Sequence, residues 1–112
     1  MAEENQHKKI ALEKIENWAK AGHTCFDILD LESKEFSRLL DDILEKKDVI
    51  ENLAANFGSG FPNLVQAVSM ALDNYRNKWT PEQRKERANN LKNMFLAILD
   101  SVTRQKATKS LR

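Results

Sequence analysis

The sequence predicts an all-α fold: a small antiparallel bundle of four main helices, with five or six in total if short helices also form. The chain has 112 residues with only three Gly and two Pro, and it is rich in good helix formers. Apolar residues recur every three or four positions over long stretches, as on one face of a helix. The breaks between these stretches are short, which favours antiparallel neighbours.

A chain of this length forms one domain. We assign residues 1–104 to a single helical domain and residues 105–112 to a basic, flexible C-terminal tail.

Residues 4–21 are predicted to form the first helix. Ile15 and Trp18 belong to an apolar stripe on one of its sides, and acidic and amide side chains lie opposite. Gly22 fits the position just after a helix, where a left-handed residue is often needed. The next segment, residues 23–31, is apolar enough to pack on the core, and we expect a loop or one helical turn there.

Residues 31–57 carry the clearest helical period, with apolar residues at Phe36, Leu39, Leu40, Ile43 and Leu44 and again from Ile50 to Phe57. Lys47 interrupts this stripe at an angle that faces the core. Either one helix bends there or two helices meet at residues 46–48. Val49 falls off the first stripe, and Asp48 with Glu51 has the form of a capping box, so the sequence favours a break.

Two further helices are expected in the second half of the chain. Gly58 and Gly60 form the clearest break, and Pro62 suits the first turn of a helix over about residues 62–79. Thr80 and Gln83 form a capping box for a last helix that reaches about residue 104.

The charges are divided between the two halves of the chain. Residues 1–57 contain thirteen acidic and eight basic residues, whereas residues 58–112 contain four acidic and ten basic residues. The net charge of +1 therefore hides an acidic half and a basic half. We expect these halves to contact each other, within one copy or between two.

The last helix has an unusually wide apolar face. Met94 and Leu96 extend it well beyond the ~100° stripe of an ordinary surface helix. Such a helix is either central in the bundle or covered by a second copy. The residues predicted to bind a partner are three from this helix and two aromatic residues beside loops: Leu91, Met94, Ile98, Phe61 and Trp79.

Nucleic acid is the alternative partner. Five basic residues flank the turn before the last helix: Arg76, Lys78, Arg84, Lys85 and Arg87. Residues 53–67 also resemble a helix-turn-helix pattern, with Asn63, Gln66 and Ser69 available to read bases. Arg84 lies on the core side of its helix, so it could instead pair with an acid from residues 30–48.

Catalytic and metal-binding residues are scarce. His23, Cys25 and Asp27 are the densest group, but alternate residues converge only on a strand, and metal sites need three or four converging ligands. We therefore expect no enzyme activity, no cofactor and no metal. The single cysteine excludes an internal disulfide, and neither a secretory signal nor a membrane span is evident, so a cytoplasmic protein without membrane contact is expected.

These observations predict a small non-catalytic protein-interaction module, such as an adaptor, an inhibitor or a regulatory subunit. It is expected to self-associate as a dimer or to bind another protein. The alternative is a nucleic-acid-binding regulator that uses residues 76–87 or 53–67.

Overall fold

In the computed structural model, residues 2–28, 30–58 and 60–110 are described, and for residues 2–5 and 107–110 this covers the helical backbone alone. These parts of the chain form four α-helices and no strand. The helices are α1 (Ala2–Asp27), α2 (Lys34–Ala54), α3 (Phe61–Asn77) and α4 (Pro81–Ser110). The prediction of a small all-α bundle with four main helices is confirmed.

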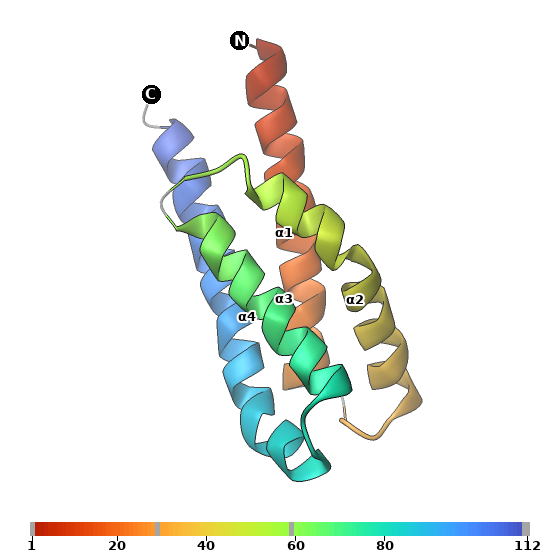
Figure 1. Ribbon diagram of the computed structural model, residues 1–112. Coiled ribbons are helices and arrows are strands. Elements are labelled where there is room, and N and C mark those ends of the chain that lie inside the picture. The colour runs from red at the N-terminus through yellow and green to blue at the C-terminus, as the bar shows by residue number, and fades with distance from the viewer. Residues whose placement is uncertain (1, 29, 59, 111–112) are drawn as a thin grey trace.

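The four helices form a ring in which neighbours run antiparallel (Figure 1). Each helix packs on the next one in the chain, and α4 packs on α1. Across the ring of helices, the side chain of Phe26 on α1 also contacts that of Tyr75 on α3. The body measures 48 × 22 × 21 Å. Helices α1 and α4 are the longest, and both extend past the α2–α3 turn at the end that carries the termini (Figure 1).

The core contains a cluster of aromatic rings contributed by all four helices. The ring of Phe26 meets those of Phe36, Tyr75 and Phe95 with centroids 5.3–6.2 Å apart. Trp18 packs edge-on against Phe95 at 5.3 Å. Such pairs each contribute about 0.5–1.5 kcal/mol beyond their buried area. Because every helix supplies a ring, the cluster ties the ring of helices together.

Gly22 does not end α1, contrary to the sequence-based prediction. The helix continues to Asp27, and Gly22 lies in its interior against α4. A Cβ atom on Gly22 would lie only 2.3 Å from the ring of Phe95. The glycine therefore permits a close approach of two helices, and the segment predicted as a loop is largely helical.

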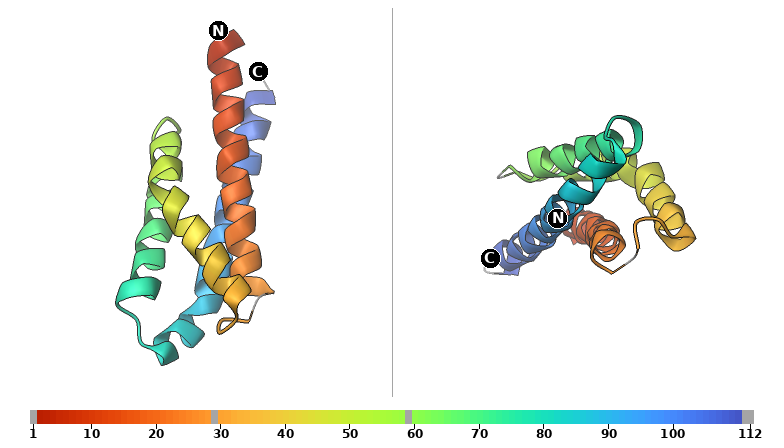
Figure 2. Two further views of the ribbon diagram at one scale, coloured as in Figure 1. Left: turned by 90° about the vertical axis from the view of Figure 1, so that its right-hand side faces the viewer. Right: turned by 90° about the horizontal axis from the view of Figure 1, so that it is seen from below.

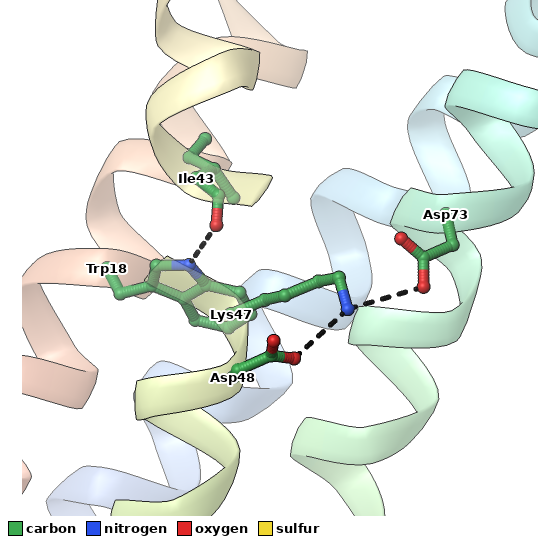
Figure 3. Close-up of polar contacts among 5 residues, drawn as sticks. All are labelled: Trp18, Ile43, Lys47, Asp48 and Asp73. Carbon is green, nitrogen blue, oxygen red and sulfur yellow. Dashed lines mark hydrogen bonds and ion pairs between the residues drawn. The ribbon is translucent and has the colours of Figure 1, made fainter. Parts of the chain in front are cut away.

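Helix α2 is continuous through residues 46–48, so the predicted break is wrong. The helix changes direction partway along (Figures 1 and 2). Trp18 Nε1 donates a hydrogen bond of 3.0 Å to the carbonyl oxygen of Ile43, in the middle of α2 (Figure 3). Bends commonly lie where a side chain engages a backbone carbonyl of the helix.

Lys47 of α2 forms an ion pair that links this helix to α3. Its ammonium lies 3.3 Å from the Asp48 carboxylate and 3.4 Å from that of Asp73 on α3 (Figure 3). Burial alone would lower the pKa of Lys47, but the hydrogen bonds and charges of the two carboxylates outweigh it and raise this pKa. Lys47, the one cation in the apolar stripe of α2, is therefore paired with Asp48 of its own helix and with Asp73 of α3.

Local signals set the other helix ends. Ser33 caps α2, its hydroxyl accepting from Phe36 N at 3.1 Å. Gly60 adopts a positive φ of 77° just before α3. The predicted box at Thr80 is confirmed by reciprocal hydrogen bonds of 3.0 and 3.2 Å with Gln83. Helix α4 continues to Ser110, past the predicted end near residue 104, and residues 111–112 of the predicted tail lie outside the described residues.

The acidic and basic halves do meet within one chain. Ion pairs join Asp41 to Arg76, Asp27 to Lys92, and Glu16 to Lys106. These side chains are all partly exposed, so each pair contributes only about 0–1 kcal/mol. The charge division thus reflects antiparallel pairing of helices and adds little stability.

Candidate functional site

The five residues predicted to bind a partner lie at different depths. Leu91 and Ile98 are 1% and 0% exposed, and Phe61 is 2% exposed. Met94 and Trp79 are half-buried. Helix α4 lies between α1 and α3 in the ring, so two helices of the same chain cover most of its wide apolar face, and Leu96 at its edge stays 43% exposed. This corrects the hypothesis of a docking surface at Leu91, Ile98 and Phe61, which are core residues.

Arg84 has an internal role at the α3–α4 turn. Its Nε donates to the carbonyl oxygen of Tyr75 at 2.7 Å, and one Nη donates to that of Arg76 at 3.1 Å. These are carbonyls of the last turn of α3, which lack partners within the helix. The predicted pairing of Arg84 with an acid of residues 30–48 is therefore replaced by a cap on α3.

Two more bases of the predicted nucleic-acid cluster have internal contacts. Arg87 stacks on the ring of Trp79 at 4.8 Å, a cation–π contact. Arg76 forms the ion pair with Asp41. Lys78 and Lys85 are exposed, and neither forms an ion pair within the described residues. Most of the cluster is thus used to hold the turn and the neighbouring helix.

The helix-turn-helix resemblance of residues 53–67 does not extend to the arrangement of helices. In that motif the two helices cross at about 90–120°. Here α2 and α3 are antiparallel neighbours (Figure 1). Ser69, one of the predicted base-reading residues, is 1% exposed in the core, and its hydroxyl has no hydrogen-bond partner. These residues therefore form a helical hairpin.

His23, Cys25 and Asp27 do not converge. All three lie on α1, where alternate residues point in different directions. Cys25 is fully buried, and burial raises the pKa of its thiol to about 12. A thiol in such a setting is a packing group, since nucleophilic cysteines need a lowered pKa. No three His, Cys, Asp or Glu side chains gather as a metal site in the described residues.

A groove between α1 and α2 contains two hollows. Its first part is a cavity of about 400 Å³, within the ~300–1,000 Å³ range of ligand pockets. Trp18 and Ala21 of α1 line it, together with Ile43, Val49 and Ile50 of α2. Val49 is 56% exposed although it is apolar. The indole of Trp18, which donates to the carbonyl oxygen of Ile43 (Figure 3), is part of this lining.

The groove continues toward the end of the bundle that carries the termini. A second hollow of about 370 Å³ is lined by His7, Lys8 and Ala11 of α1 and by Leu53 and Phe57 at the end of α2, with Asn56. Leu53 and Phe57 are half-buried. Both hollows therefore lie between the same two helices, one after the other, and we call them together the α1–α2 groove.

The polar rim of the α1–α2 groove is mainly basic. Lys14 and Lys46 border the first hollow from opposite helices, and Lys8 borders the second. Asp42 is the one carboxylate in the lining. None of the three lysines forms an ion pair with another described residue. The first half of the chain is acidic as a sequence, yet this surface of it is basic.

Sequence reasoning missed this groove, although one signal for it was present. Val49 falls off the main apolar stripe of residues 31–57, and that offset was interpreted as a helix break. In the continuous helix α2, this offset places the Val49 side chain beside α1, where it stays 56% exposed. The position of Val49 beside the main stripe was therefore a signal for an exposed apolar surface between the two helices.

A third hollow of about 180 Å³ lies beside the cap of α3. Its polar lining includes Asp41, Arg76 and Arg84. These groups already bind each other or the carbonyls of α3. The hollow is therefore the space around internal contacts and is a weaker candidate than the α1–α2 groove.

Comparison with known proteins gives no relative: no family model matches the chain, and no curated protein and no solved structure does. Within the described residues, no helix is long and apolar enough to cross a membrane.

Proposed function

We propose that this protein is a small non-catalytic helical interaction module, an adaptor, inhibitor or regulatory subunit, that binds a protein partner through the α1–α2 groove. The observation that carries the proposal is the apolar lining of the groove, in which Val49 is 56% exposed and Ala21, Leu39, Leu53 and Phe57 are half-buried. Exposed apolar patches with a polar rim mark interaction sites on soluble proteins.

The chemistry of the groove supports binding without catalysis. The lining of the first hollow combines apolar side chains with two amines, one amide and one carboxylate. It contains no Ser, Cys or His that could act as a nucleophile beside a base. We therefore keep a protein without enzyme activity as part of the proposal.

Self-association is a second form of the same proposal. The original reason for it was the wide face of α4, most of which the chain itself covers, with Leu96 remaining 43% exposed. A second copy would instead have to use the α1–α2 groove. Val49→Arg should then disrupt the dimer, which sedimentation experiments measure. We also propose a cytoplasmic location, where the buried thiol of Cys25 would stay reduced.

Site-specific crosslinking in the native host tests the proposal. A photo-crosslinking residue replaces Val49 in one variant and Met70 of α3 in the other. The two side chains are 56% and 60% exposed, so they are matched in accessibility. A discrete adduct at position 49 that is absent at position 70 is expected. Equal adducts at both positions, or none at position 49, would overturn the proposal.

A further inference from the structure

We infer that the α1–α2 groove receives one amphipathic helix of a partner protein, with acidic residues on both sides of its apolar stripe. This inference rests on the proposed function and specifies the chemistry of the partner. Three features carry it: the spacing of the two hollows, their apolar lining, and the rim lysines, which form no ion pair with another described residue.

The dimensions of the groove suit a short helix. On α1 the first hollow is lined between Lys14 and Ala21, and the second between His7 and Ala11. With a rise of 1.5 Å per residue, the centres of these segments lie about 13 Å apart, and the whole groove is about 21 Å long. A partner helix of roughly 14 residues has this length, and its residues i and i+7 or i+8 are about 11–12 Å apart.

The lining offers a seat for two apolar anchors of such a helix. Ile43, Val49 and Ile50 surround the first hollow beside Trp18, and Leu53 with Phe57 surrounds the second. Helix-in-groove recognition uses anchors at i, i+3 or i+4, and i+7. An anchor in each hollow would cover Val49, which the chain itself leaves more than half exposed.

The rim determines the charge of the partner. Lys14 of α1 and Lys46 of α2 lie on opposite sides of the first hollow, so a helix bound there would have one lysine on each side. Both are exposed and lack an ion pair among the described residues. Elsewhere in the bundle, Lys47 and Arg76 are held by acids of a neighbouring helix. The rim lysines, which form no ion pair with another described residue, would pair with Asp or Glu residues beside the apolar stripe of a partner helix.

A helix fits these observations better than an extended peptide or an acyl chain. The described part of the chain has no sheet edge that an extended segment could join. An acyl chain carries a single anionic head, whereas the lysines occupy both sides of the groove and both hollows. Both of these ligands are nevertheless included as arms of the test.

The test uses three synthetic helical peptides of equal length with the same apolar stripe and with acidic, neutral or basic flanks. Binding to the full chain is followed by isotope-edited NMR titration, which also locates the bound face. The acidic peptide should bind at least about tenfold more tightly than the basic one, since two or three rim pairs favour it. Shifts should concentrate on residues 7–21 and 42–57. The preference should shrink with added salt.

Charge reversal on the rim supplies the matched variants. Lys14→Glu with Lys46→Glu should remove the preference for the acidic peptide and favour the basic one. The control is Lys20→Glu with Lys85→Glu, which changes the net charge equally at exposed lysines outside both hollows and should keep the preference. Val49→Arg should abolish binding, whereas Met70→Arg should leave it within about twofold. Thermal unfolding of each variant confirms that it is folded.

Several results would overturn the inference. One is equal binding of all three peptides, and another is binding that maps to α3 and α4. A third is tight binding of an extended acidic peptide or of oleate when the helical acidic peptide does not bind. If position 49 still gives its specific crosslink in any of these cases, the inference fails and the proposed function survives. If that crosslink is absent, the proposed function fails as well.

Discussion

The two sides of α1 differ in how closely they are covered. Toward α4, Gly22 allows the Phe95 ring to touch the backbone, and Glu16 and Asp27 bind lysines of α4. Toward α2, two hollows of about 400 and 370 Å³ remain, beside hydrogen bonds from the Trp18 indole to Ile43 and from the Cys25 thiol to Phe36. We call the closely packed side of α1 toward α4 the sealed side, and the side toward α2 with the two hollows the open side. The difference shows that the groove is not a consequence of weak packing throughout the bundle.

Gly22→Ala should give the largest effect, because it breaks the sealed side. A methyl group 2.3 Å from a buried ring forces α1 and α4 apart. Overpacking costs about 1–3 kcal/mol or more, and the better helix propensity of Ala returns only about 1 kcal/mol. Because 2.3 Å is far below any normal Cβ contact, we take the upper end of this cost and expect a net loss of about 2 kcal/mol in urea denaturation. Gly58→Ala is the control, because nothing lies within 4 Å of that position, and it should be near neutral.

Cys25 tests through pH how closely the C-terminal end of α1 is packed, where its thiol donates to the carbonyl oxygen of Phe36 on α2. Burial raises its pKa to about 12, so between pH 9 and 12 the unfolded chain ionises while the folded chain stays neutral. This stabilisation is present below the unfolded pKa and is lost as pH rises. Unfolding free energy should fall by about 2 kcal/mol from pH ~8 to ~10.5 because of this thiol. Cys25→Ala should lack that part of the slope, and equal slopes in both proteins would contradict the close packing around the thiol.

The sequence predicted the parts of this fold that local signals determine. The apolar period of residues 31–57 and the Thr80–Gln83 box both depend on neighbours in the chain, and both appear in the structure. Gly22 was misinterpreted because a glycine that ends a helix and one that admits a distant ring look identical in sequence. Only the approach of Phe95, far along the chain, distinguishes them.

The candidate site was less predictable for a related reason. Leu91 and Ile98 were predicted as a partner surface because helix periodicity shows which residues share a face, but not which helix covers it. The groove depends on the direction of α2 relative to α1, which no local pattern encodes. Its basic rim was hidden as well, since the lysines are scattered over both helices in an acidic half of the sequence.

Trp18→Phe should loosen the open side and spare the sealed side. The phenyl ring can still pack on Phe95, but it cannot donate to the carbonyl oxygen of Ile43. The lost hydrogen bond and the smaller ring should cost about 1–2 kcal/mol. Amide exchange should rise in α2 more than in α4. Trp79→Phe is the control, because that half-buried ring has no indole hydrogen bond in the described structure, and a larger effect there would contradict the role given to Trp18.

Ala21→Leu should change the free energy of unfolding least. It compares the two sides of α1 directly, because Ala21 faces the hollow toward α2 and its neighbour Gly22 faces Phe95 of α4. Ala21 is half-buried and lines the first hollow of the groove. Added methyl groups can enter that space, so a gain of about 0.5 kcal/mol is expected where Gly22→Ala causes a loss. Urea denaturation of the two variants side by side measures the contrast. The same leucine should weaken binding of the acidic helical peptide, since it fills the seat of one anchor. A destabilised Ala21→Leu would mean that α1 is closely packed toward α2 as well, and the hollow would then not be space that a partner can use.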